Sequence, residues 1–198
     1  MIDIIKFGNF KDFEKNKNKK QIILCNSFRG HNQYLNSLKN RNNGKYNKIP
    51  NYLVTRDGEV ISLLSDDSYS DFFVDQEVNK NSIIICLENH GWGQKVPLSN
   101  SFFNWINEPI DGDIFEKKWR DKIYWQNYTE KQLDSLVELC NKLTKKFSIN
   151  KSFIGHNTKV DGIKIFNGIV CRSNYNNKYT DPNPSFKFEE FKNRVENE

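Results

Sequence analysis

The fold of this chain is constrained most strongly by two short runs that are almost entirely apolar, Gln21–Cys25 and Ser82–Glu88. Uninterrupted apolar runs of this kind are typical of strands that lie inside a sheet. Side chains alternate along a strand, so Ile84, Cys86 and Glu88 share one face of the second run. A carboxylate on the face of so apolar a strand requires a partner or a function. The two runs therefore predict an α/β protein with a polar group at the end of one central strand.

The remaining elements follow from turn residues and from helical periodicity. Asp57–Gly58 lies between two apolar stretches and marks the turn of a β-hairpin. Thr129 and Gln132 fit a capping box at the start of a long amphipathic stripe. The predicted elements are a helix containing 34–38, a hairpin over 52–64, a helix over 129–147, a strand at 152–155 and a helix at 188–195.

The length of 198 residues fits a single domain, 1–198. Residues 1–20 are predicted to be an N-terminal extension, with a short strand at 2–7 and a solvated lysine-rich loop. Residues 89–128 contain all four tryptophans and show no clear periodicity. We expect this stretch to be a Trp-rich insertion that either packs on the core or forms a wall of a substrate site.

Composition and charge indicate which kinds of binding partner we expect for this chain. The formal charge is +5, but the lysines are scattered, which favours general attraction to anionic surfaces over a nucleic-acid groove. The four cysteines form no CxxC pair, which favours a reducing compartment. No apolar run approaches the roughly 20 residues of a membrane span, and the N-terminus lacks the pattern of a signal peptide. We therefore expect a monomer with no membrane span and no nucleic-acid partner.

The segment 153–186 contains the residues with the most evident chemistry. His156 ends the short apolar run that begins at Phe153, and Asp181 opens an Asp-Pro-Asn-Pro stretch. In α/β proteins, functional residues commonly follow the carboxyl ends of strands. One hypothesis is that His156 and Asp181 bind one metal together with a third ligand upstream. The alternative is that His156 ends a strand and hydrogen-bonds a neighbour.

Taken in order, the motifs resemble those of the zinc-dependent N-acetylmuramoyl-L-alanine amidases, the superfamily that includes the peptidoglycan recognition proteins. The matching stretches are Ile22–Cys25, Tyr-Leu-Val-Thr-Arg-Asp-Gly at 52–58, Asn81–Glu88, Ile-Gly-His at 154–156 and Asp-Pro-Asn-Pro-Ser-Phe at 181–186. The resemblance implies a central mixed β-sheet flanked by helices, with one Zn²⁺ bound by Cys25, His156 and Asp181.

Cys25 departs from the family pattern, in which a His is expected at that position. A thiolate is a legitimate zinc ligand, and the alternative for Cys25 is a buried structural thiol. His31 and His90 lie in predicted loops and are candidates to replace the missing ligand. His90 is the better candidate because it follows the strand that contains Cys86.

The resemblance also suggests roles for residues around the metal. Glu88 is the nearest available general base, and the alternative is that it forms a salt bridge to Arg or Lys. Tyr179 replaces a Lys that the family carries, and it is assigned to the catalytic group. Arg172 and Lys178 are cations near that position that could stabilise an oxyanion. Together with Asn51, they are predicted to bind substrate.

The implied reaction is hydrolysis of the amide between N-acetylmuramic acid and L-alanine in peptidoglycan. An enzyme without a signal peptide suits a bacteriophage or prophage endolysin that resides in the host cytoplasm before release and then acts on the cell wall. The alternative is a catalytically degenerate amidase fold that binds a muropeptide or a protein partner.

Overall fold

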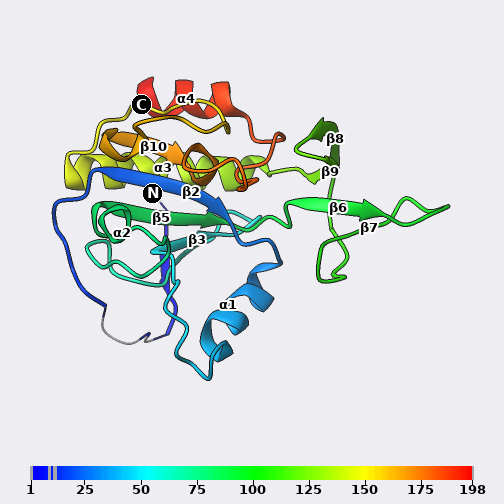
Figure 1. Ribbon diagram of the computed structural model, residues 1–198, viewed down its shortest axis with the longest axis horizontal. Helices are drawn as coiled ribbons and strands as arrows, with labels where there is room; N and C mark the ends of the chain where they lie inside the picture. Colours follow the sequence, from blue (N-terminus) through cyan, green and yellow to red (C-terminus); the bar gives the residue numbers. More distant parts are fainter. Residues whose placement is uncertain (1, 9, 11–12, 198) are drawn as a thin grey trace.

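The computed structural model describes residues 2–8, 10 and 13–197, and it contains a central sheet of six strands. Their order across the sheet is β1-β4-β3-β5-β2-β10 (Figure 1). Only the β3–β4 pair is antiparallel among these neighbours, so the sheet is mixed, as predicted. The strands are β1 (Ile4–Lys6), β2 (Gln21–Asn26), β3 (Tyr52–Val54), β4 (Val60–Ser62), β5 (Ser82–Leu87) and β10 (Gly168–Cys171).

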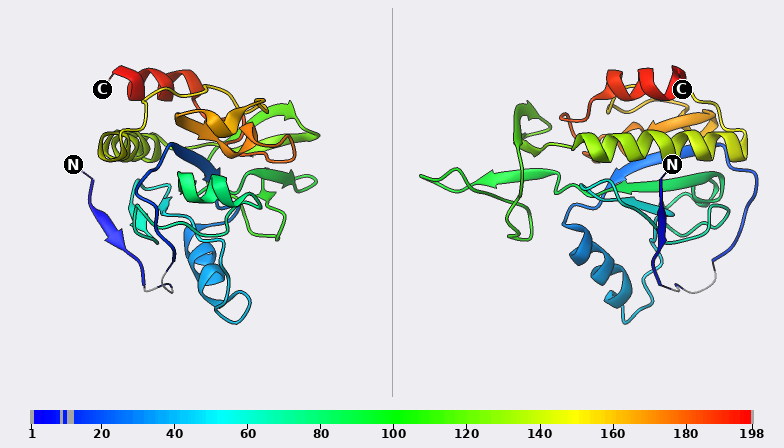
Figure 2. Two further views of the ribbon diagram at one scale, coloured as in Figure 1. Left: turned by 60° about the vertical axis from the view of Figure 1, so that its left-hand side comes forward. Right: turned by 180° about the vertical axis from the view of Figure 1, so that it is seen from behind.

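Helices cover both faces of this sheet. Helices α3 (Glu130–Phe147) and α4 (Phe188–Asn197) lie on one face, and α1 (His31–Asn40) lies on the other, as the right-hand view of Figure 2 shows. Alternation along β2 divides its side chains between two cores. Ile22 and Leu24 pack with α3 and α4, whereas Ile23 and Cys25 pack with α1.

The long helix α3 begins and ends where its sequence requires. Thr129 caps it by accepting a hydrogen bond from the backbone N–H of Gln132. Its last turn is followed by Ser148 in the left-handed conformation, with φ of 54°. The stripe predicted from periodicity is buried, and it contains Leu133, Leu136, Val137, Cys140 and Leu143.

One local prediction was wrong. Residues 152–155 form only a single bridge between Phe153 and Ile169, and the strand in this region is β10. The polar stretch before β5, for which no element was predicted, contains a short helix, α2 (Gln76–Asn81), which Asp75 caps. The short strand predicted at 2–7 is confirmed as β1, which pairs with β4 in the central sheet.

Residues 92–126 form a second, antiparallel sheet with the order β7-β6-β9-β8. It extends from the edge at which the carboxyl ends of β2 and β5 lie (Figure 1). Trp125 is fully buried, whereas Trp105 is 52% exposed. No helix in the described ranges is long and apolar enough to cross a membrane. The strands are β6 (Trp92–Lys95), β7 (Phe102–Phe103), β8 (Ile114–Trp119) and β9 (Lys122–Gln126).

Candidate functional site

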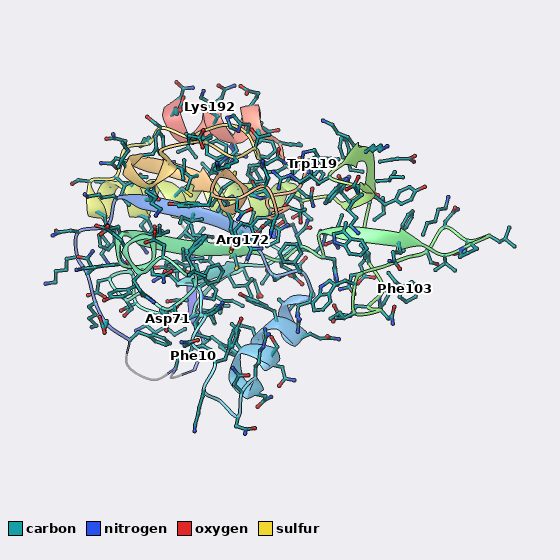
Figure 3. The ribbon with its side chains drawn as sticks, in the orientation of Figure 1. Phe10, Asp71, Phe103, Trp119, Arg172 and Lys192 are labelled. Carbon is teal, nitrogen blue, oxygen red and sulfur yellow. The ribbon has the colours of Figure 1, made fainter. Side chains whose placement is uncertain are left out.

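The candidate site lies where the parallel strands β2, β5 and β10 end. Cys25 is in register with Cys86 across β2 and β5, and Leu24 is in register with Cys171 across β2 and β10. Arg172 follows β10 directly and therefore lies beside the end of β2. Figure 3 labels Arg172 near the centre of the molecule, at the tips of these strands.

Cys25 is a buried thiol that faces another thiol. Its side chain is fully buried, and its Sγ lies 2.6 Å from Sγ of Cys86. Both cysteines are free. Burial, reinforced by the contact with Cys86, raises the pKa of the Cys25 thiol well above its ordinary value. Full burial and the contact with Cys86 do not match a ligand that would share one metal with the exposed His156.

Asp181 is fully buried and forms an ion pair with Arg172. Arg172 Nε lies 2.9 Å from Oδ1 and 2.8 Å from Oδ2 of the carboxylate. Oδ2 also accepts a hydrogen bond from the backbone N–H of Asn26, at 2.9 Å. Burial alone would lower the pKa of Arg172, but the Asp181 carboxylate outweighs it and raises that pKa. The guanidinium is thus a permanent cation at this position.

His156 is exposed and makes its contacts locally. Its Nδ1 accepts a hydrogen bond from the backbone N–H of Thr158, at 3.3 Å, and lies 2.9 Å from Oγ1 of the same residue. Its carbonyl oxygen accepts a hydrogen bond from Nδ2 of Asn174. This matches the alternative in which His156 hydrogen-bonds a neighbour.

The residues predicted to bind zinc do not fit a zinc ion. Within residues 2–8, 10 and 13–197, no group of three or more His, Cys, Asp or Glu side chains is placed to hold a metal. The physical reasons differ for each predicted ligand. Cys25 contacts Cys86 in the core, Asp181 is engaged by a guanidinium, and His156 is exposed.

A cavity of about 490 Å³ opens over Arg172. The rings of Phe28 and Tyr179 lie 5.4 and 4.5 Å from the guanidinium carbon. Tyr179 therefore contacts Arg172, although its predicted catalytic role is not tested by this contact. The lining residues are Asn26, Ser27, Phe28, Arg29, Tyr34, Ser37, Leu38, Arg41, Tyr46, Lys48, Phe72, Trp105, Arg172 and Tyr179.

The second sheet holds Phe28 in place beside this cavity. Phe28 has a φ of 58°, which is uncommon for a residue with a bulky side chain. Its carbonyl oxygen accepts hydrogen bonds from Nε1 of Trp105, at 3.2 Å, and from Nδ2 of Asn104, at 3.4 Å. The loop after β7 thus supports one wall of the site.

Glu88, the predicted base, is occupied by hydrogen-bond donors. Its Oε1 accepts from the backbone N–H of His31, at 2.8 Å, and lies 2.9 Å from the ring Nδ1 of His31. Oε2 accepts from the backbone N–H of Arg56, at 2.9 Å. Burial would raise the pKa of Glu88, but these donors outweigh it and lower that pKa. The Glu88 carboxylate therefore has a positioning role, because it orients the ring of His31. The partner of Glu88 is thus a histidine, and not the Lys or Arg of the alternative interpretation.

His90 and His31 line one small cavity of about 240 Å³, together with Glu88. Two hydrogen bonds fix the orientation of the Asn104 side-chain amide, because its Oδ1 accepts from the backbone N–H groups of Ile106 and Glu108. Its Nδ2 therefore donates to Nδ1 of His90, at 2.8 Å, and the proton of the neutral ring is on Nε2. Burial lowers the pKa of His90, which favours this neutral form.

Asn51 and Lys178 are not among the residues that line the Arg172 cavity. Asn51 is 2% exposed, and its amide is used within the fold. Nδ2 donates to the carbonyls of Ser65 and Ser68, and Oδ1 accepts from the N–H of Ile84. This geometry corresponds to a structural residue and does not support substrate binding by Asn51. Lys178 is exposed and remains a prediction.

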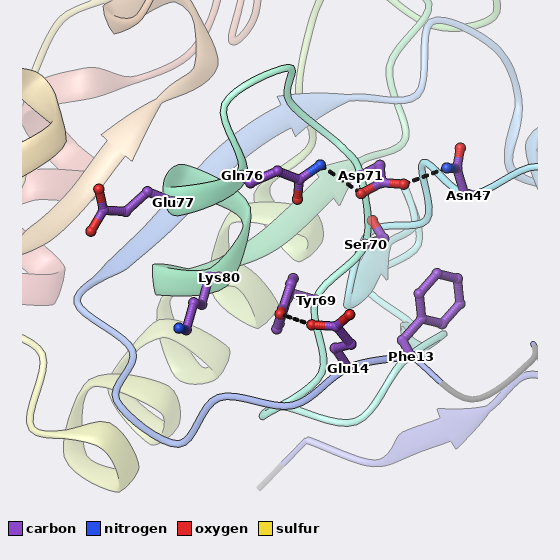
Figure 4. Close-up of a pocket in the computed structure, with 9 residues that line it drawn as sticks. All are labelled: Phe13, Glu14, Asn47, Tyr69, Ser70, Asp71, Gln76, Glu77 and Lys80. Atoms are coloured by element: carbon purple, nitrogen blue, oxygen red, sulfur yellow. Dashed lines mark hydrogen bonds between the residues drawn. The ribbon is translucent and has the colours of Figure 1, made fainter.

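A larger cavity, of about 690 Å³, lies beside α2 and is lined by none of the predicted site residues (Figure 4). Five of its polar side chains are hydrogen-bonded to one another. Tyr69 donates to Glu14, and Asp71 accepts from Gln76 and from Asn47. These pairs leave the Arg172 cavity as the better candidate for a functional site.

Sequence reasoning missed the contributions of Phe28 and Arg29 to the site. The stretch Ser27–Arg29 follows β2 directly, and its aromatic and basic residues at the end of a central strand were the available indication. It also treated Arg172 and Asp181 separately, although the structure pairs them.

Comparisons with known proteins identify the family. A family model described as N-acetylmuramoyl-L-alanine amidase matches residues 15–182. A comparison with curated protein sequences gives no match.

Solved structures share the fold at low sequence identity. N-acetylmuramoyl-L-alanine amidase LysC from Clostridium intestinale URNW is 12% identical, with 98% of each chain covered and a TM-score of 0.61. The amidase AmiD from E. coli is 13% identical, with 95% of this chain and 60% of that chain covered and a TM-score of 0.55. The complex of peptidoglycan recognition proteins LCa and LCx is 12% identical, with 97% and 95% covered and a TM-score of 0.53. The chain thus belongs to the N-acetylmuramoyl-L-alanine amidase family, whose fold is shared by amidases and by peptidoglycan recognition proteins.

Proposed function

We propose that this protein binds muropeptides of peptidoglycan at the Arg172 cavity and does not hydrolyse them by zinc chemistry. The observation that carries the proposal is the buried ion pair between Arg172 and Asp181. A guanidinium engages the carboxylate that the resemblance assigns to zinc, and a cation so placed repels a second cation.

Proteins of the same fold support the binding part of the proposal. The E. coli amidase AmiD was solved with the substrate anhydro-N-acetylmuramic acid-L-Ala-D-gamma-Glu-L-Lys. The recognition proteins LCa and LCx were solved as an ectodomain complex with bound tracheal cytotoxin. The fold therefore accommodates recognition as well as hydrolysis.

Amidase activity is the second candidate, and the contact between His31 and Glu88 favours it. A carboxylate that holds Nδ1–H of a histidine leaves Nε2 free to accept a proton from water. His90, whose Nε2 carries a proton, lines the same cavity and could donate it to a leaving group. This pair of histidines provides acid–base chemistry but no group that would polarise the amide carbonyl, so we rank binding first.

One experiment separates the two candidates. The protein, purified without chelators, is sedimented with purified peptidoglycan, and released peptides and bound zinc are both measured by mass spectrometry. We expect co-sedimentation, no released peptide and less than stoichiometric zinc. Peptide release that is lost in His31→Ala would establish hydrolysis, and one zinc per chain would overturn the zinc-free site. Failure to co-sediment would reject peptidoglycan binding.

A further inference from the structure

Arg172 has hydrogen-bonding capacity that the fold does not use. Its Nε is bound to Asp181, but its two terminal amino groups have no hydrogen-bond partner within the described part of the chain. The side chain is 18% exposed and lines the cavity. Since Asp181 and the rings of Phe28 and Tyr179 hold the guanidinium, its free donors are fixed in direction before any ligand arrives.

Three more cations line the same cavity, and none is neutralised by the protein. Arg29, Arg41 and Lys48 form no ion pair with any described residue. The lining contains no Asp or Glu side chain. The cavity therefore presents a concentrated positive charge, in a chain whose other cations are largely scattered.

Two of these cations are held in place by aromatic rings and not by carboxylates. The guanidinium carbon of Arg29 lies 5.5 Å from the ring of Trp105, and that of Arg41 lies 4.7 Å from the ring of Tyr46. Cation–π contacts orient a guanidinium without cancelling its charge. The charge stays available to a ligand, and planar guanidinium groups match the geometry of carboxylates and phosphates.

We propose that Arg172 acts as the resident cation of this site in place of a metal, and that the cavity binds an oxyanion of its ligand through Arg172, Arg29, Arg41 and Lys48. The oxyanion is a carboxylate or a phosphate. On the basis of the proposed function, we assign this oxyanion as a carboxylate on the stem peptide of a muropeptide.

The test uses a triple variant with a matched control. Arg29→Gln/Arg41→Gln/Lys48→Gln removes the cavity cations and leaves the buried ion pair intact. Lys45→Gln/Lys118→Gln/Lys142→Gln removes the same charge from exposed positions outside the cavity. Both are titrated with a muropeptide that has free carboxylates, with the same muropeptide after amidation of those groups, and with inorganic pyrophosphate. Trp105, which lines the cavity, provides the fluorescence readout.

We expect the triple variant to bind the free-carboxylate muropeptide at least about tenfold more weakly than the wild type, because charge-assisted hydrogen bonds are lost. The control should bind within about twofold of the wild type. Amidation should weaken binding to the wild type and should have little further effect on the triple variant. Arg172→Lys, which keeps the charge but loses the fork of donors, should also bind more weakly.

The outcomes distinguish this inference from the proposed function. Equal muropeptide affinity in the triple variant and its control would overturn the oxyanion site while leaving muropeptide binding intact. Binding of pyrophosphate alone, lost in the triple variant, would support the oxyanion site and reject the proposed function. Absence of binding to all three probes would overturn both.

Discussion

The buried ion pair of Arg172 and Asp181 dominates the site at the scale of single residues. Arg172→Ala would leave the fully buried carboxylate of Asp181 without its cation. Breaking a buried pair in this way costs about 3–5 kcal/mol, so we expect a loss of that size in the free energy of unfolding. Urea denaturation followed by circular dichroism measures it. Lys178→Ala, an exposed neighbour, should change stability by less than about 0.5 kcal/mol.

Replacing both partners gives a sharper result than replacing one. Arg172→Met/Asp181→Leu removes both charges together, and such replacements are commonly neutral or stabilising. We expect the double variant to regain most of the stability lost in Arg172→Ala and to lose ligand binding. A double variant as unstable as Arg172→Ala would show that packing, and not the ion pair, determines the effect.

Glu88 gives the protein a predictable response to acid. The N–H groups of Arg56 and His31 favour its ionised form and hold its pKa below the ordinary value of 4.5. A lowered carboxyl pKa stabilises the fold fully above that ordinary value, and the stabilisation is lost as the pH falls through the folded-state pKa. At about pH 7, Glu88→Gln should lose roughly 1.5–3 kcal/mol, the usual contribution of hydrogen bonds to a charged group.

Urea denaturation of the wild type and Glu88→Gln at several pH values checks this response. The difference between them should shrink as the pH falls below about 4.5. Glu59→Gln, at an exposed position of the hairpin that contains Arg56, is the control. A difference that stays constant down to about pH 3 would contradict the argument.

Individual site residues were harder to predict than their neighbourhood. Sequence reasoning placed Cys25 and Glu88 at the ends of two central strands, and these strands are paired. It left Asp181 in a loop, which the structure brings to the backbone of Asn26 at the end of β2. Their roles depend on partners that a linear pattern does not reveal. Asp181 meets Arg172 because a turn follows β10, and Glu88 meets His31 because α1 begins beside the end of β5.

At the scale of elements, the N-terminal cap of α3 connects local sequence to the hairpin. Thr129 Oγ1 accepts from the N–H of Gln132, at 3.1 Å, and donates to the carbonyl of Arg56. We expect Thr129→Ala to lower the free energy of unfolding by about 1–2 kcal/mol, because a cap and a contact to the hairpin disappear together. Thermal unfolding measures this. Lys142→Ala, on the exposed face of the same helix, should have little effect, and an equal loss there would contradict the capping argument.

Elements with strong periodicity were predicted well, and short polar ones were not. Helix α3 and strands β2 and β5 bury long apolar patterns, so their positions follow from sequence. Strand β10 is short, and its place in the sheet depends on parallel pairing with β2, a contact distant in sequence. Helix α2 has two buried residues, Val78 and Asn79, and its best local indication was the cap at Asp75.

At the scale of the whole molecule, a buried polar network joins the second sheet to the first. Nδ2 of Asn89 donates to the carbonyl of Gln126, at 3.1 Å. Nδ2 of Asn183 reaches both Oδ1 of Asn89, at 3.0 Å, and the same carbonyl, at 3.1 Å. All three side chains are fully buried. The stretch 89–128 shows no hydrophobic periodicity in the sequence. These hydrogen bonds hold it to the rest of the chain, and an internal apolar pattern does not.

This network predicts that the two sheets unfold together. All four tryptophans lie in 89–128, so tryptophan fluorescence reports the second sheet, whereas circular dichroism at helical wavelengths reports α1, α3 and α4. Buried polar groups are costly to leave unpaired. Opening the second sheet alone would leave Asn89 and Asn183 without their hydrogen-bond partners. We therefore expect urea transitions with the same midpoint by both probes, as in two-state unfolding. Asn183→Ala should separate them by shifting the fluorescence transition to lower urea, whereas separated transitions in the wild type would show that the second sheet is an independent unit.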